Sequence, residues 1–153
     1  MKYFLSIIGV AACFVLLCFV GEESGYIQLA RMGDTVSFFA LLLVVVSILI
    51  SVGLHKDFFR AFRIAYGRKG GKSLKEMKRA KEAVDLAIKS TAGSGILGFC
   101  VGVVESSYCD RLASIPINIG VSTISLLYAV IIALFLIPIQ SRLKLKIMEY
   151  MGE

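Results

Sequence analysis

The chain has 153 residues, of which 58% are hydrophobic and 18% are charged, and its net charge is +6. A soluble domain is about half apolar and about a quarter charged, whereas the charges here stand in blocks between long apolar runs. This composition excludes an ordinary soluble domain and predicts one polytopic membrane domain. It also argues against nucleic-acid binding, because 15 of the 17 Lys and Arg fall at Lys2, within 56–89 and within 142–146. That asymmetry is typical of the positive-inside rule.

Residues 3–20 form an apolar run behind Lys2, which we interpret as the first transmembrane helix. A cleaved signal peptide is the alternative, because Val10–Cys13 is similar to a lipoprotein cleavage box. The apolar run continues for seven residues past Cys13 without a polar break, and its removal would upset the charge asymmetry. We therefore expect the first span to be retained.

The second span is predicted over 36–54, because a helix of 19 residues is long enough to cross about 30 Å of hydrocarbon. The longest polar segment follows at 55–89 and is rich in Lys and Arg, so we expect a cytoplasmic helical hairpin. Apolar residues from Phe58 to Tyr66 keep helical spacing. This spacing predicts that the second span continues as a helix out of the membrane.

The second arm of the hairpin is predicted to begin after a Gly-rich break at 67–71. Ser73–Glu76 has the form of a capping box, which opens a helix. An apolar stripe follows at helical spacing, formed by Met77, Ala80, Val84 and Ala87. Because no Pro or Gly intervenes before Ala92, this helix should run directly into the third span.

Two apolar runs predict the third span over 90–105 and the fourth over 117–139, followed by a cytoplasmic tail at 140–153. Small residues allow close helix packing in lipid, and the third span carries four of them: Ser94, Gly95, Gly98 and Gly102. The fourth span carries one polar face: Asn118, Ser122, Ser125 and Tyr128. Polar groups in an apolar helix are expected to face a partner or a water-filled path. Pro138 is expected to kink the fourth helix or to end its regular pairing.

The sequence lacks motifs for catalysis. It contains no nucleophile–base arrangement, no phosphate-binding Gly-rich loop and no metal-ligand cluster, and its four cysteines have no C-x-x-C spacing. We therefore expect that the chain is not an enzyme and that it holds no metal or cofactor.

The third and fourth spans resemble those of the MotA/TolQ/ExbB family of proton-channel subunits. Three glycines occupy the glycine positions of the family pattern G-x-x-G-T-x-x-G: Gly95, Gly98 and Gly102. Phe99 stands where the family has Thr. In the fourth span, the polar segment 122–128 is followed by an apolar stretch that ends in Pro138 and then by a basic residue, Arg142, as in the MotA branch. Counting back from Pro138 places Ser125 on the pore-facing Thr of the family.

This resemblance implies a four-span subunit of the bacterial inner membrane with both termini in the cytoplasm. It implies a ring, a pentamer, around a single-span MotB-like or ExbD-like partner that supplies a membrane Asp. Proton or sodium flow through the ring would then drive mechanical work. The implied ion path is lined by Asn118, Ser122, Thr123, Ser125 and Tyr128, with the tyrosine at its inner end. The cytoplasmic segment of 35 residues is far shorter than that of MotA, which argues against contact with a flagellar rotor.

Two other classes of protein are compatible with the same spans. A self-contained small transporter normally needs an ionisable residue within the membrane, and no predicted span has one in its interior, since Glu105 lies at an outer edge. A structural membrane protein, such as a scaffold or a holin-like subunit, needs neither a partner nor a polar face. The resemblance favours the channel subunit over both.

Overall fold

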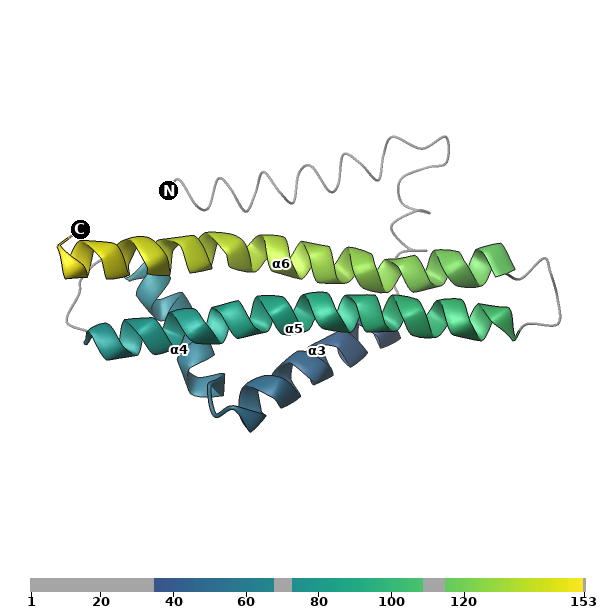
Figure 1. The fold of residues 1–153 in the computed structure, drawn as a ribbon, viewed down its shortest axis with the longest axis horizontal. Helices are drawn as coiled ribbons and strands as arrows, with labels where there is room; N and C mark the ends of the chain where they lie inside the picture. The colour runs from purple at the N-terminus through teal and green to yellow at the C-terminus, as the bar shows by residue number, and fades with distance from the viewer. Residues whose placement is uncertain (1–34, 68–72, 109–114, 153) are drawn as a thin grey trace, which may run out of the picture.

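The computed structural model describes residues 35–67, 73–108 and 115–152, without the side chains at 35, 36, 105, 115–118 and 121. Within these ranges the chain forms four helices (Figure 1): α3 (Thr35–Ser51), α4 (His55–Tyr66), α5 (Leu74–Ser107) and α6 (Ile115–Met151). The described part of the chain is therefore all-helical, as predicted. The predicted first span, 3–20, lies outside the described residues.

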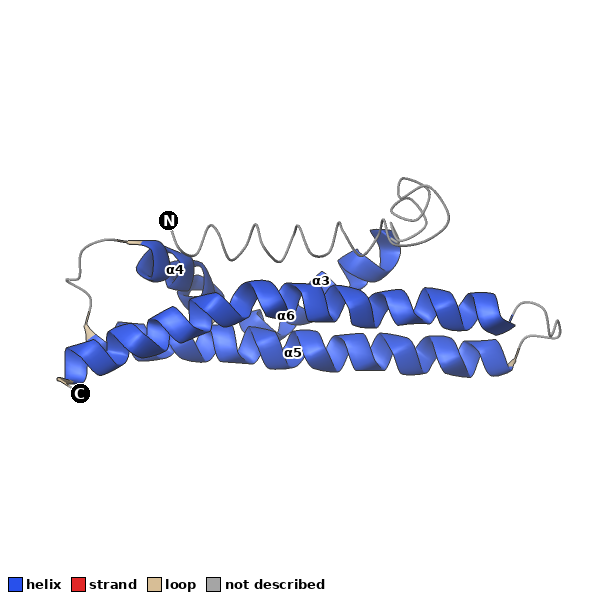
Figure 2. Ribbon diagram, turned by 90° about the horizontal axis from the view of Figure 1, so that it is seen from above, coloured by secondary structure: helices blue, strands red, loops and turns tan. Residues whose placement is uncertain are grey.

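The two longest helices, α5 and α6, lie side by side and antiparallel along most of their length (Figures 1 and 2). α5 has 34 residues and α6 has 37. At a rise of about 1.5 Å per residue, each helix is longer than the roughly 30 Å thickness of the hydrocarbon core. Both contain a segment apolar enough to cross a membrane, Leu74–Val104 and Ser122–Met151. A third candidate is the bent pair of α3 and α4.

The second span does not continue straight into α4, so that prediction is wrong. α3 ends at Ser51, and α4 departs at an angle of 102°. The turn is a Schellman motif, in which the Gly53 N–H donates to the Ile50 carbonyl and the Leu54 N–H donates to the Leu49 carbonyl, both at 2.9 Å. Gly53 has a φ of +73°, a conformation that costs residues with a Cβ about 1–2 kcal/mol. Leu49 and Leu54 are both buried, as the apolar contact of this motif requires.

The start of α5 agrees with its sequence signals. The Ser73 hydroxyl accepts a hydrogen bond from the Glu76 N–H at 3.4 Å, which is one half of the predicted capping box. The Glu76 carboxylate instead lies 3.5 Å from the Arg60 guanidinium of α4. α5 then continues without a break through Ala92 to Ser107, so the predicted continuity with the third span is confirmed.

Pro138 lies inside α6 and does not end it. The helix continues to Met151, so most of the predicted tail, 140–153, is helical. Proline removes one backbone hydrogen bond, and packing beyond it stabilises the continuation: Ile139, Leu143 and Ile147 are spaced four residues apart and are buried.

Apolar side chains of three helices pack together at one end of the molecule, which we call the basic end: α4, residues 74–89 of α5 and residues 140–151 of α6. The buried residues there are Ala61, Ile64, Ala65, Met77, Ala80, Ala83, Val84, Ala87, Leu143 and Ile147. This cluster includes all four members of the stripe predicted for α5. Alanines predominate on α5, which lets α4 lie close across the long helices (Figure 1).

Basic side chains of α6 bind the last carbonyl groups of α4. The Arg142 Nη1 donates to the Ala65 carbonyl at 2.6 Å, and the Lys146 Nζ donates to the Ile64 carbonyl at 2.6 Å and to the Gly67 carbonyl at 2.9 Å. The final carbonyl groups of a helix have no intrahelical partner and carry its partial negative charge. Two cations therefore satisfy these groups and hold α4 against α6.

Candidate functional site

The predicted packing of the two long helices is realised in one contact, which we call the glycine–serine seam: Gly95, Gly98 and Gly102 of α5 against Ser122 and Ser125 of α6. A Cβ on Gly102 would lie 2.6 Å from the Ser122 Cβ, and a Cβ on Gly98 would lie 3.1 Å from the Ser125 Cβ. A Cβ on Gly95 would meet the Cβ of Ala129 and the Ser125 carbonyl, the latter at 3.3 Å. The absence of side chains thus permits the close approach of the two backbones.

The Ser125 hydroxyl joins the two helices within the seam. Its Oγ donates to the Ser122 carbonyl at 2.7 Å and lies 3.3 Å from the Gly95 carbonyl of α5. Both serines are buried, with exposed fractions of 7% for Ser122 and 6% for Ser125. A hydroxyl can donate only one proton, so the shorter bond within α6 dominates and the Gly95 carbonyl is the alternative acceptor.

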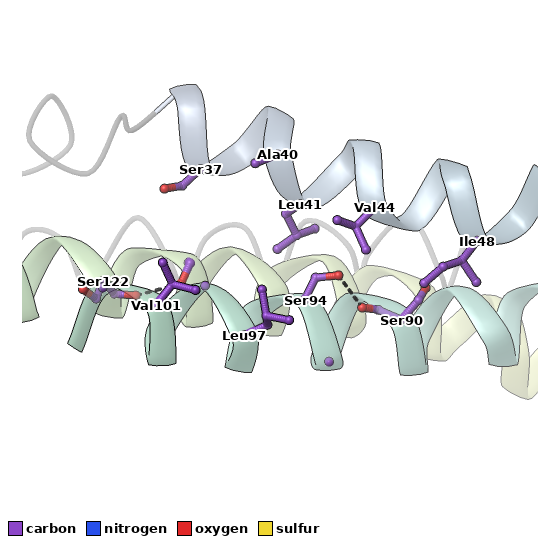
Figure 3. A pocket seen from close by; sticks show the side chains of 14 residues that line it. Ser37, Ala40, Leu41, Val44, Ile48, Ser90, Ser94, Leu97, Val101 and Ser122 are labelled. Atoms are coloured by element: carbon purple, nitrogen blue, oxygen red, sulfur yellow. Dashed lines mark hydrogen bonds between the residues drawn. The ribbon is translucent and has the colours of Figure 1, made fainter. Parts of the chain in front are cut away.

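A groove of 760 Å³ opens beside the seam, between α3 and α5 (Figure 3). Ser122 and Ser125 reach it from α6, so these two members of the predicted polar face border the groove. Its walls carry five serines and otherwise apolar residues: Ser37, Ala40, Leu41, Val44, Ile48, Ser90, Gly93, Ser94, Leu97, Gly98, Val101, Gly102, Ser122 and Ser125.

The hydroxyls of the α5 wall bond to their own helix. The Ser90 Oγ donates to the Ala87 carbonyl at 3.1 Å, and the Ser94 Oγ donates to the Ser90 carbonyl at 2.7 Å. Ser94, which was predicted to belong to the helix-packing face, lines the groove that faces α3 (Figure 3). Such hydroxyls offer lone pairs to a passing ion, but they do not ionise near neutral pH. None of the described residues that line the groove is ionisable.

Two of the other residues predicted to line the path, Thr123 and Tyr128, do not belong to the seam. Thr123 is exposed, and its Oγ1 donates to the Ile119 carbonyl at 2.9 Å. Tyr128 is half-buried against α3, where its ring meets Phe38 edge-on with centroids 5.6 Å apart. The side chain of Asn118 lies outside the described residues. The structure therefore unites Ser122 and Ser125, while Thr123 lies on another side of α6.

An ionic cluster at the basic end was not predicted from the sequence. Asp57 in the first turn of α4 is only 5% exposed, yet it lies 3.2 Å from Arg60 and 3.1 Å from Arg79 of α5. A carboxylate in the first turn of a helix interacts favourably with the partial positive charge of the helix N-terminus. Its ion pair with Arg79 also joins α4 to α5. Its signal in the sequence was a single acid, Asp57, within the basic helix 55–66.

Further polar contacts at the basic end join α6 to α5. The Gln140 Nε2 donates to the Asp85 Oδ1 at 2.7 Å, and Lys81 lies 3.6 Å from the same carboxylate. The basic end is thus held by both apolar packing and ion pairs, whereas the groove is open and uncharged. These two regions have distinct chemistry.

Comparison with protein-family models, with curated proteins and with solved structures finds no match to this chain.

Proposed function

We propose that this chain is the ring-forming subunit of an ion-driven membrane complex of the MotA/TolQ/ExbB type. It spans the bacterial inner membrane four times, with residues 3–20 as the first span. Copies of the chain surround a single-span partner whose carboxylate binds protons or sodium ions. Ion flow past that carboxylate drives movement of one component against the other.

The observation that carries this proposal is the uncharged, serine-lined groove next to the glycine–serine seam. Ser122 and Ser125 reach this groove, which offers hydroxyl and carbonyl oxygens to an ion. A proton path inside a bilayer also needs a group that takes up and releases protons, such as a desolvated carboxylate. The described part of the groove contains no such group. In this proposal, the carboxylate of a second polypeptide supplies it.

The charge distribution supports the proposed orientation. The segment 56–89 carries 11 Lys and Arg against four Asp and Glu, and 142–146 adds three more Lys and Arg. The described residues of both segments lie at the basic end, where the N-terminal part of α5 lies beside the C-terminal part of α6. Positively charged loops remain in the cytoplasm, so the basic end faces the cytoplasm and the opposite ends of α5 and α6 face outward.

A structural or scaffold role is the second candidate, and one observation favours it. Ser90, Ser94 and Ser125 each donate to a backbone carbonyl of the same helix. Hydroxyls bonded in this way can simply satisfy themselves in an apolar helix. In a scaffold, the seam only packs helices and the groove holds lipid.

Reconstitution distinguishes the two candidates. Vesicles that contain this chain alone should not conduct protons. Adding a single-span partner with a membrane Asp should produce flux, and changing that Asp to Asn should remove it. Flux from this chain alone would contradict the proposal, and silence with the partner known to be bound would favour the scaffold.

The role of the seam hydroxyl is tested in the complex by Ser125→Ala. Hydrogen bonds between membrane helices are worth about 0.6–2 kcal/mol, so the ring should remain assembled while ion flux falls. Ser51→Ala is the matched control, because Ser51 is exposed and bonds to the Ser47 carbonyl of its own helix at 2.8 Å, away from the groove. Equal flux in both variants would identify Ser125 as a structural residue.

A further inference from the structure

α4 presents three chemically distinct sides along its length. At 100° per residue, one side is buried against the long helices: Asp57, Ala61, Ile64 and Ala65. The next side is aromatic: Phe58, Phe59, Phe62 and Tyr66. The third side is basic: Lys56, Arg60 and Arg63. Two of the three sides are thus available to a partner.

The aromatic side is partly exposed. Phe58 packs edge-on against Phe59 and Phe62, with ring centroids 5.8 Å and 5.2 Å apart. Phe59 nevertheless remains 72% exposed and Tyr66 remains 50% exposed. In water, such an aromatic surface is unfavourable. At a membrane surface, aromatic rings are favoured because they can bury their apolar surface at the boundary between headgroups and acyl chains.

The bend sets the direction of α4 relative to the bilayer. α4 lies at 102° to α3, so it runs close to the plane of the membrane surface if α3 crosses the membrane. The bend itself also exposes apolar side chains on both sides of Ser51: Ile50 is 56% exposed and Val52 is 57% exposed. The bonds from Arg142 and Lys146 hold α4 in this direction.

On the basic side, two of the three cations have no carboxylate partner among the described residues. Arg60 pairs with Asp57 and Glu76. Lys56 and Arg63 are exposed, and neither pairs with a carboxylate in the part of the chain that the structure describes. Anionic lipid headgroups complement such free cations at a membrane surface.

We infer that α4 is an interfacial helix, whose aromatic side inserts into the bilayer surface and whose Lys56 and Arg63 bind anionic phospholipid headgroups. Helices with one aromatic or apolar side and one basic side lie in the interface in this way. The inference does not depend on ion conduction, and it holds equally for a scaffold protein.

Fluorescence quenching tests the insertion, because the chain contains no Trp. The variant Phe59→Trp of the full chain is reconstituted in vesicles of phosphatidylcholine and phosphatidylglycerol with brominated acyl chains. Its indole should be quenched, whereas that of Tyr150→Trp, which is 61% exposed in the last turn of α6, should not. Equally weak quenching in both variants would overturn the inference and leave the aromatic side to a protein partner.

Native mass spectrometry of the same protein tests the headgroup contact. Each neutralised cation near an anionic surface is worth about 1 kcal/mol, which corresponds to a roughly fivefold loss of affinity. The double variant Lys56→Gln/Arg63→Gln should therefore retain phosphatidylglycerol far more weakly than the wild type. Lys75→Gln/Lys78→Gln is the matched control, because both lysines are exposed on α5 and should matter little. An equal loss in the two double variants would show general charge attraction and no site on α4.

Discussion

Replacing Gly102 by Ala should force the two long helices apart, whereas the same change at Gly93 should be tolerated. A Cβ on Gly102 would lie 2.6 Å from the Ser122 Cβ and 3.4 Å from its Cα. Carbon atoms in contact prefer about 3.5–4.0 Å, so the backbones would have to separate locally by about 1 Å. The Ser122 hydroxyl can rotate away, but its Cβ moves only with the backbone. No atom lies within 4 Å of a Cβ on Gly93.

The comparison of the two variants isolates the packing cost. Ala is favoured over Gly in a helix by about 0.5–1 kcal/mol, and this gain applies to both positions. Overpacking costs about 1–3 kcal/mol, so Gly102→Ala should be about 1–3 kcal/mol less stable than Gly93→Ala. Gly95→Ala should behave like Gly102→Ala, because the Cβ of Ala129 is equally rigid. Gly98→Ala should cost less, because its Cβ would lie 3.0 Å and 3.1 Å from the Oγ and Cβ of Ser125.

Unfolding in mixed micelles of rising SDS content, followed by circular dichroism, measures this difference. The unfolding midpoint should fall for Gly102→Ala and should stay level or rise for Gly93→Ala. If the two variants have the same midpoint, the close approach of α5 and α6 at the seam is not what stabilises the fold. Loss of the mutant protein during purification would be resolved by Gly98→Ala, which should survive with an intermediate midpoint.

Gly53→Ala should lower the free energy of unfolding by about 1–2 kcal/mol, the cost of a left-handed conformation, and Gly53→Asn should lower it less; thermal unfolding in detergent ranks them. Lys146→Met should raise amide hydrogen exchange in α4 about tenfold relative to α3, since a cation at a helix C-terminus is worth up to about 2 kcal/mol; equal exchange would show that the lysine bonds contribute little. Asp57→Asn should cost about 1–3 kcal/mol, because Arg60 loses a charge-assisted bond at a buried carboxylate. The exposed Glu82→Gln should leave the SDS midpoint unchanged, and equal midpoints in both acid variants would contradict a structural role for Asp57.

The helices were predictable because their signals are local. The long apolar runs indicated α3 and α6, helical spacing indicated α4 and the first half of α5, and the capping box at Ser73–Glu76 located the start of α5. The uninterrupted run to Ala92 indicated that α5 continues without a break into the third apolar run. The 102° bend was missed because the aromatic residues after it keep helical spacing, and spacing carries no information on direction. A local signal was nevertheless present in Gly53 followed by the apolar Leu54, the residue types of a Schellman motif.

The candidate site was predictable only in part. The spacing of Gly95, Gly98 and Gly102 indicated a packing face, and that face does meet α6. Ser122 and Ser125 share a side of their helix, but Thr123 follows Ser122 by 100° and lies on another side. The groove was beyond prediction, since it depends on how α3 leans against α5, and that angle arises from tertiary packing.

The contact between α6 and the last carbonyl groups of α4 has a consequence for the order of events during synthesis. The bonded residues stand 77 to 82 positions apart, and the two cations lie near the C-terminal end of the chain. Because chains emerge from the ribosome N-terminus first, α4 leaves it long before Arg142 and Lys146. The local bonds of the turn at Gly53 can form early, whereas the contacts that hold α4 against α6 can form only after Arg142 and Lys146 have been made.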